Sequence, residues 1–156
     1  MTPRSITTHG LAAFVMIAAC AGCADSPYEL APVSGAVTLN GEPLANATVS
    51  YEPRGGPERS IVGPGSVGTT DAEGRYTLST FKDEPGAVVG QHTVRISTFK
   101  SQFKDIKNSD AVEVVSEERV PWRYNRSTEL VATVATGGTD QADFELTGAP
   151  PRKGRR

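Results

Sequence analysis

The sequence predicts an all-β domain with many turns, whose strands form one two-layer β-sandwich. Three observations support this prediction. The 16 glycines and 11 prolines are spread along the 156 residues, as expected for short strands separated by turns. Apolar residues recur at every second position in several short runs. No long stretch after residue 24 has the periodicity of an amphipathic helix.

Six segments show the period of two that is typical of half-buried strands. They are residues 33–39, 47–51, 76–78, 92–96, 130–134 and 144–146. Each has one mainly apolar face, so we expect these faces to meet in one core. The residues expected to be buried there are Val37, Val49, Tyr76, Val94, Ile96, Leu130 and Phe144.

Residues 33–53 are predicted to form a β-hairpin around which the rest of the chain is organised. Asn40 and Gly41 both tolerate positive φ, which favours a tight turn between the two strands. Pro43 has no backbone N–H to donate to the ladder. We therefore expect the connection between the strands to be longer than two residues.

The first 19 residues have the features of an export signal. Arg4 gives a positive start, and residues 11–19 form an apolar run of nine residues, whereas a membrane-spanning helix needs about 20. The run ends in Ile17-Ala18-Ala19-Cys20, which resembles a bacterial lipobox. We therefore expect Cys20 to be lipidated, with Cys23 as the alternative. An ordinary signal peptide, or a thiol pair for redox or metal chemistry, are the other interpretations.

Several segments connect the predicted strands or flank them. Residues 20–32 contain prolines and no periodicity, and are expected to be a linker that follows the lipidated cysteine. Residues 54–68 are rich in glycine and proline, which predicts a surface loop that is either mobile or used for binding. Residues 100–119 are expected to leave the core, with a short strand at 111–115. The sandwich is thus expected to span residues 33–148.

The C-terminal tail of the chain is strongly basic. Residues 149–156 have four basic residues among the last five, and are expected to be disordered. The tail is either solvated or in contact with anionic surfaces.

Residues 71–74 fit a type I turn, with Asp71 at its start and Gly74 at its end. Calcium ligation by Asp71 and Glu73 is the less favoured alternative.

A cluster of aromatic and cationic residues lies between two predicted strands. It consists of Trp122, Arg123, Tyr124 and Arg126. Amphipathic aromatic side chains suit contact surfaces, so the cluster is the candidate binding surface for a sugar or a protein. The alternative is that Trp122 and Tyr124 fill one end of the sandwich.

The residues that catalysis needs are scarce in this sequence. His92 is the only histidine after the export signal, and on an apolar face it is expected to be a hydrogen-bonded core or rim residue. No set of histidine and glutamate ligands for a catalytic zinc is present. The carboxylate pairs Asp83-Glu84 and Glu117-Glu118 are adjacent in sequence and therefore point apart. We predict no catalytic residue, no metal site and no cofactor.

Three motifs together resemble the carboxypeptidase regulatory-like domain. They are V-S-G-x-V-T-L-N-G-x-P-L at 33–44, T-T-D-A-x-G-x-Y-x-L at 69–78 and G-x-H-x-V-x-I at 90–96, where relatives more often have Tyr in place of His92. The closing V-P-x-R-Y-N-x-S-T-x-L resembles small lipoproteins of this type in planctomycete-like bacteria. The resemblance, over residues 33–147, implies a transthyretin-like, immunoglobulin-like two-layer β-sandwich of about seven strands. It implies a binding or structural module, because in enzymes this domain accompanies the zinc peptidase and is not its catalytic part.

Taken together, the sequence predicts a non-catalytic, exported, lipid-anchored module for binding or assembly in the bacterial cell envelope. Its expected partners are the membrane, through the N-terminal lipid, and an envelope protein or glycan. Nucleic acid is not expected, because the net charge is −2 and the pI is near 5.7. The alternatives are a hydrolase with an unrecognised carboxylate site and a purely structural lipoprotein.

Overall fold

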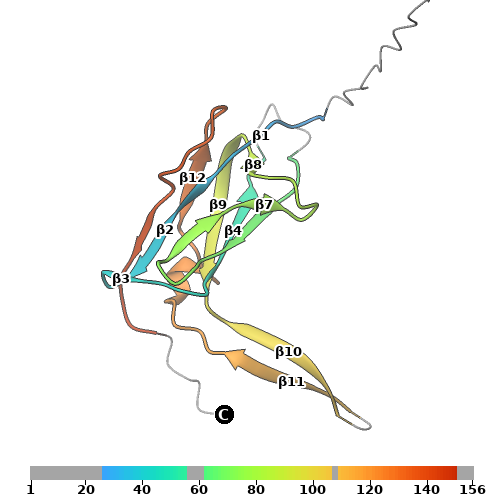
Figure 1. Ribbon diagram of the computed structural model, residues 1–156, viewed down its shortest axis with the longest axis vertical. Coiled ribbons are helices and arrows are strands. Elements are labelled where there is room, and N and C mark those ends of the chain that lie inside the picture. Colours follow the sequence, from blue (N-terminus) through green and yellow to red (C-terminus); the bar gives the residue numbers. More distant parts are fainter. Residues whose placement is uncertain (1–25, 56–61, 107–108, 151–156) are drawn as a thin grey trace, which may run out of the picture.

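Alternating buried and exposed side chains bring the strands into two sheets packed face to face, so the predicted all-β fold is confirmed (Figure 1). The computed structural model describes residues 26–55, 62–106 and 109–150. The first sheet has the order β12-β9-β4-β5-β7, with bounds Val131–Val134, Gly90–Ser97, Thr48–Pro53, Ser66–Thr69 and Ser79–Thr80. The second consists of β13, β2, β3 and β6, with bounds Phe144–Leu146, Ser34–Leu39, Glu42–Pro43 and Arg75–Thr77.

The core lies between these sheets and contains most of the residues predicted to be buried. Val37, Val49, Tyr76, Val94 and Ile96 are buried. Leu130 and Phe144 are only partly buried, which corrects the prediction for these two. Leu130 precedes β12 at the edge of the first sheet, and in β13 the fully buried position belongs to Leu146.

A buried pair of tyrosines joins the two sheets. The hydroxyl of Tyr76 in β6 donates to the carbonyl of Ala142, 2.6 Å away. The Tyr51 hydroxyl of β4 lies 3.3 Å from the Tyr76 oxygen and, since that hydroxyl uses its proton on Ala142, Tyr51 is the donor. Burial raises the pKa of both hydroxyls, so both stay protonated and able to donate.

The predicted hairpin of residues 33–53 is wrong in its pairing. β2 and β4 belong to different sheets, and β2 pairs instead with the short β3. Asn40 and Gly41 do form the tight turn, with φ of 55° and 87°. Leu39 lies opposite Glu42, so the connection has two residues and Pro43 does not prevent pairing. A short edge strand needs few donors, which is why a proline is tolerated there.

The chain then crosses from the second sheet to the first. Thr70 fixes this crossing, because its hydroxyl donates to the Leu44 carbonyl at 2.5 Å and accepts from the Ala47 amide at 2.8 Å. Leu44 and Ala47 are both buried. The apolar residues that suggested a hairpin therefore line the core from two opposite layers.

Part of the predicted loop at 54–68 is a strand. Residues 66–69 form β5, which pairs with β4 on one side and β7 on the other. The inward positions of β5 are Ser66 and Gly68, and both are small. A Cβ atom on Gly68 would lie 2.5 Å from the Thr77 carbonyl oxygen, so close contact between the sheets requires glycine here.

The turn at residues 71–74 is confirmed. One oxygen of the Asp71 carboxylate accepts from the amides of Glu73, at 3.0 Å, and Arg75, at 2.7 Å. Gly74 has a φ of 77° and closes the turn through its amide. The Asp71 side chain thus holds the turn through backbone hydrogen bonds.

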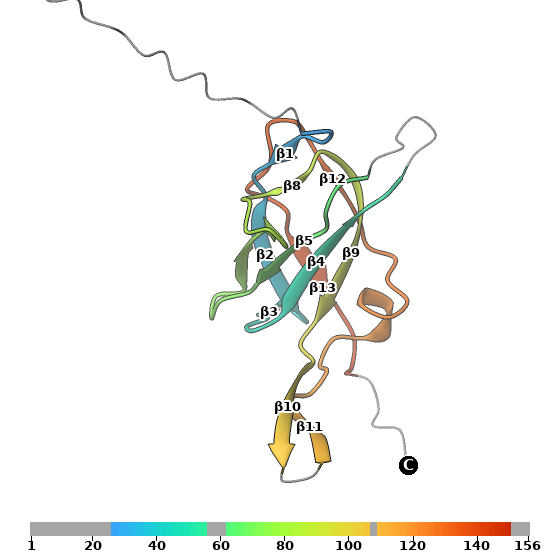
Figure 2. The ribbon, with the colours of Figure 1, turned by 90° about the vertical axis from the view of Figure 1, so that its right-hand side faces the viewer.

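Two smaller sheets complete the structure. β1 (Leu30–Ala31) pairs with β8 (Ala87–Val88) at one end of the sandwich. At the other end, β10 (Lys100–Ile106) and β11 (Ser109–Ser116) form a hairpin that projects away from both sheets (Figure 2). Residues 100–119 therefore leave the core as predicted, with more strand than the expected 111–115.

The predictions for the two ends of the chain fall mostly outside the described residues. The export signal, Cys20 and Cys23 lie within residues 1–25, and the basic residues of the tail lie within 151–156. Leu30–Ala31, at the end of the predicted linker, form β1, and Ala31 is buried. The described part of the chain contains no helix with the length and apolar character needed to cross a membrane.

Candidate functional site

The predicted cluster at 122–126 lies on a short helical turn beside the first sheet. Trp122–Tyr124 form the 3-10 helix η1, and Pro121 precedes it with an extended ψ of 146°. The amides of Asn125 and Ser127 both donate to the Trp122 carbonyl, at 3.1 and 3.0 Å. We call residues 121–130 the η1 segment.

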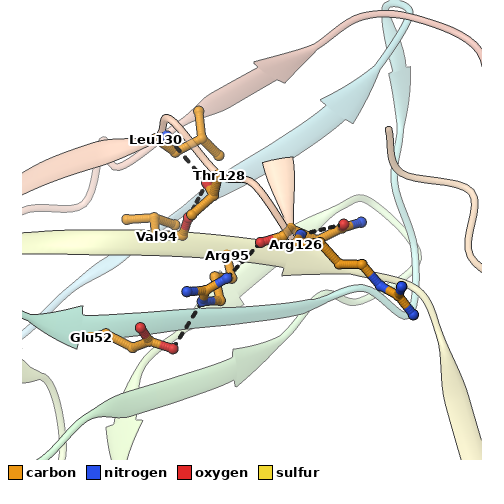
Figure 3. Close-up of polar contacts among 7 residues, drawn as sticks. Glu52, Val94, Arg95, Arg126, Thr128 and Leu130 are labelled. Atoms are coloured by element: carbon orange, nitrogen blue, oxygen red, sulfur yellow. Dashed lines mark hydrogen bonds and ion pairs between the residues drawn. The ribbon is translucent and has the colours of Figure 1, made fainter. Parts of the chain in front are cut away.

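A buried asparagine attaches the η1 segment to the sheet. The Asn125 side chain donates to the Val120 carbonyl at 3.1 Å, and its backbone carbonyl accepts from Arg95 at 2.7 Å. Arg95, on β9, is also ion-paired with Glu52 on β4, at 3.0 Å (Figure 3). Both members of that pair are partly exposed, so its main effect is to orient the Arg95 guanidinium towards Asn125.

A threonine hydroxyl continues the strand ladder from β12 into this segment. The Thr128 hydroxyl donates to the Val94 carbonyl at 2.6 Å and accepts from the Leu130 amide at 3.2 Å. The Val94 amide donates to the Leu130 carbonyl at 3.0 Å. The segment is therefore held along β9 by backbone and side-chain hydrogen bonds (Figure 3).

Two of the four cluster residues contact the chain after β13, although the Arg123 side chain is also exposed. Tyr124 is half-buried against the core, and its hydroxyl accepts from the Thr147 amide at 3.3 Å. Arg123 lies 4.8 Å from the centre of the Tyr124 ring and donates to the Thr147 carbonyl at 2.5 Å. Hydrogen bonding with Thr147, with a further contribution from Arg123, lowers the pKa of Tyr124 below its usual value. Arg123 and Tyr124 thus attach the chain after β13 to η1.

The other two residues face solvent. The Trp122 side chain is 57% exposed, and the guanidinium carbon of Arg126 lies 5.9 Å from the centre of its ring. Arg126 is exposed as well. We call this pair the Trp122–Arg126 surface. Tyr124 therefore packs on the sandwich, as the alternative prediction stated, whereas Trp122 does not. Trp122 and Arg126 are the members of the cluster that are left as the candidate contact surface.

His92 is a core residue, as predicted. Its side chain is fully buried, and its Nε2 donates to the Val88 carbonyl at 2.6 Å. Burial lowers the pKa of the imidazole below its ordinary value, and the Nδ1 atom has no hydrogen-bond partner among the described residues. A side chain in this position cannot contact a molecule at the surface.

Two of the acidic residues beside one surface groove hold backbone. A groove of about 570 Å³ lies where β2 and β6 meet residues 139–143, and it is lined in part by Asp71, Asp140 and Asp143. Asp143 accepts from the Ala36 amide at 2.7 Å, and Asp71 closes its own turn. Within the described ranges, no group of three or more His, Cys, Asp or Glu residues is arranged to hold a metal ion.

Glu118, from the second carboxylate pair, also holds backbone. Glu118 accepts from the Thr98 amide at 3.0 Å, the Val120 amide at 2.9 Å and the Ser97 hydroxyl at 2.5 Å. This carboxylate lies at the base of the β10–β11 hairpin and joins both of its strands to the sandwich. Sequence reasoning missed this function, because two of the three donors, Ser97 and Thr98, lie about 20 positions earlier in the chain.

Comparisons with known proteins give little further information. No family model matches the chain, and no curated protein matches it either. Among solved structures, the crystal structure of a 9R-lipoxygenase from Cyanothece PCC8801 aligns with a TM-score of 0.39 and 17% sequence identity. The alignment covers 80% of this chain and 17% of the lipoxygenase chain. Likeness at this level supports no conclusion about fold or activity.

Proposed function

We propose that this protein is an exported, lipid-anchored β-sandwich that binds a component of the bacterial cell envelope and catalyses no reaction. The observation that carries the binding proposal is the Trp122–Arg126 surface, an exposed aromatic and guanidinium pair on a segment fixed by hydrogen bonds. Binding residues are commonly presented in this way, on a connecting segment positioned by a rigid scaffold. The resemblance to carboxypeptidase regulatory-like lipoproteins supports the same proposal.

The anchor is proposed from the sequence alone. Cys20 follows an apolar run and two small residues, as lipidated cysteines do in the lipoproteins that this chain resembles. Metabolic labelling with a fatty-acid analogue should mark the wild-type chain and the Cys23→Ala variant, and should fail to mark Cys20→Ala. Labelling that depends on Cys23 would show that Cys23 carries the lipid. Labelling that depends on neither cysteine would contradict the proposed anchor.

The binding function is tested on a chain without its anchor. In the Cys20→Ala/Cys23→Ala background, the protein should still sediment with purified cell envelopes. Adding Trp122→Ala and Arg126→Gln should release it into the supernatant. Equal sedimentation of both chains would exclude this surface as the binding site.

The rival proposal of a hydrolase has its own test. The same protein should hydrolyse no peptide, ester, glycoside or phosphate substrate, with or without added zinc or calcium. Turnover that survives repurification and is abolished by Asp140→Asn or Asp143→Asn would overturn the proposal that the protein catalyses no reaction. It would indicate a hydrolase with its active site in the groove.

A further inference from the structure

The end of the sandwich that carries β1 and β8 also carries a largely exposed aromatic ring, Phe81. We propose that Phe81, with Tyr28 nearby, contacts the lipid bilayer to which Cys20 anchors the chain. This contact holds the domain with one end against the membrane. The inference rests on the proposed function, because it gives the anchored protein a second point of contact with the same bilayer.

Strand register across the first sheet places Phe81 at this end. β9 starts at Gly90, just after β8, and antiparallel pairing then runs from β9 to β4, from β4 to β5 and from β5 to β7. β5 therefore starts at this end with Ser66, and Thr80, which lies opposite Ser66, ends β7 there. Phe81 follows Thr80 directly. In Figures 1 and 2, β1 and β8 lie at the upper end of the sandwich and the β10–β11 hairpin lies at the lower end.

A set of hydrogen bonds fixes the turn that presents this ring. The Thr80 hydroxyl accepts from the amides of Lys82 and Glu84, both at 3.2 Å. The Thr80 amide donates to the Glu84 carbonyl at 2.8 Å, and Asp83 has a positive φ of 61°. Phe81 is 75% exposed, more than any other large apolar side chain in the described ranges. The turn thus holds Phe81 outside the core.

Tyr28 contributes a second aromatic ring at the same end. A Cβ atom on Gly63 would lie 3.0 Å from the Tyr28 ring, and one on Gly65 would lie 3.1 Å from the Phe81 ring. The two rings therefore pack at opposite ends of one short stretch, residues 63–65. Tyr28 is partly exposed. Tyrosine is enriched where lipid headgroups meet acyl chains, and apolar rings insert at the same depth.

The anchor is close enough to bring this end to the lipid. Seven residues separate Cys20 from Tyr28, a span of at most about 30 Å. The chain then joins the sandwich, because the Glu29 carbonyl accepts from the Val89 amide at 2.9 Å and β1 pairs with β8. A lipid at Cys20 therefore keeps Phe81 near the membrane at a high effective concentration. Burial of one ring is too weak to hold a free domain on a bilayer, so the contact depends on the anchor.

The charges beside Phe81 indicate an apolar contact. The next three residues, Lys82, Asp83 and Glu84, are exposed and together carry one positive and two negative charges. This balance gives no attraction to anionic headgroups. The contact therefore uses burial of the ring, and it should form on zwitterionic lipid and depend little on salt.

Tryptophan fluorescence in brominated vesicles tests the contact. The full lipidated protein is reconstituted in phosphatidylcholine vesicles, either plain or brominated on the acyl chains near the headgroup. In Phe81→Trp/Trp122→Phe the introduced indole should be quenched about twofold or more by the brominated lipid, because it lies at the depth of the bromine atoms. Tyr28→Trp/Trp122→Phe provides a second reporter at this end and should be quenched as well. Quenching at neither position would overturn the inference.

Two positions away from this end are the controls. The wild-type chain has a single tryptophan, Trp122 on η1. Phe99 lies between β9 and β10 at the other end and is 49% exposed, so Phe99→Trp/Trp122→Phe is the matched variant. Neither indole should be quenched. Equal quenching at positions 81, 99 and 122 would show that no particular end faces the membrane. Quenching that requires phosphatidylglycerol and is lost at high salt would contradict an apolar contact.

Flotation of the same vesicles in a density gradient separates this inference from the proposed anchor. If the wild-type protein floats with the vesicles while the indole of Phe81→Trp/Trp122→Phe is not quenched, the anchor stands and the inference falls. If the wild-type protein does not float, the anchor is wrong and the inference falls with it. Flotation together with quenching at positions 28 and 81 alone supports both.

Discussion

His92 illustrates how burial determines the chemistry of a single residue. Because a carbonyl oxygen can only accept, the contact with Val88 places the imidazole proton on Nε2. The other nitrogen, Nδ1, lies buried without a partner, and the ring lies 5.4 Å from that of Tyr51. A second proton would leave a charged, unpaired N–H in the core, so burial holds the pKa of His92 below its ordinary value.

This lowered pKa predicts a loss of stability in mild acid. The unfolded chain binds a proton at His92 more readily than the folded chain, so the contribution is complete above about pH 6.5 and is lost as the pH falls below it. The free energy of unfolding should decrease by at most about 1.4 kcal/mol per pH unit in that window. His92→Gln keeps a donor for Val88 and should remove this slope. An unchanged slope in urea titrations of the variant would contradict the assignment.

Leu146 occupies the position that the sequence analysis assigned to Phe144. It is fully buried in β13, whereas Phe144 is only partly buried. Leu146→Ala should therefore lower the free energy of unfolding by about 2–5 kcal/mol. The control, Val131→Ala on the exposed side of β12, should change it by less than about 0.5 kcal/mol. A small loss at Leu146, measured by chemical denaturation, would mean that β13 does not close the core.

Among the elements, the β10–β11 hairpin is held at its base by one carboxylate. It projects beyond both sheets, and an isolated two-stranded hairpin is marginally stable at best. Glu118 holds its base through hydrogen bonds to Ser97, Thr98 and Val120. These donors contact both oxygens of the Glu118 carboxylate, so both oxygens accept hydrogen bonds within the fold.

Replacing that carboxylate by an amide should loosen the hairpin base. In Glu118→Gln a neutral amide oxygen would replace the charged acceptor of the Thr98 and Val120 amides, at an expected cost of about 1–2 kcal/mol. The amides of Thr98 and Val120 should then exchange hydrogen faster. Glu73→Gln, an exposed change on the turn at 71–74, is the control. It should leave the free energy of unfolding and the exchange rates of the Thr98 and Val120 amides unaltered. Equal exchange in the two variants would refute this function of Glu118.

The sequence predicted the strands better than it predicted their partners. Period-two patterns identified β2, β4 and β9 because each has one buried face. They could not show that β2 and β4 lie in different layers, because both faces are apolar towards the same core. β5 was missed because its inward residues, Ser66 and Gly68, are small and give no apolar alternation. The close contact between the two sheets requires these small residues, and that contact cannot be predicted from the sequence.

At the scale of the whole molecule, the candidate site is only partly readable from the sequence. Four neighbouring aromatic and cationic residues identified the η1 segment. Which of them face solvent depends on Thr147, Arg95 and Asn125, which lie on other elements or in the interior. Arg95 reaches Asn125 from β9, and the register of β9 against β4 is fixed by the fold as a whole.

We propose that the η1 segment separates binding from folding, with Trp122 and Arg126 free for a partner and Arg123 and Tyr124 holding the structure. Chemical denaturation of single variants tests it most directly. Trp122→Ala and Arg126→Gln should each change the free energy of unfolding by less than about 1 kcal/mol. Tyr124→Ala should lower it by more than about 2 kcal/mol, because a ring packed on the core and a hydrogen-bonded hydroxyl are lost. A loss at Trp122 as large as that at Tyr124 would contradict the claim.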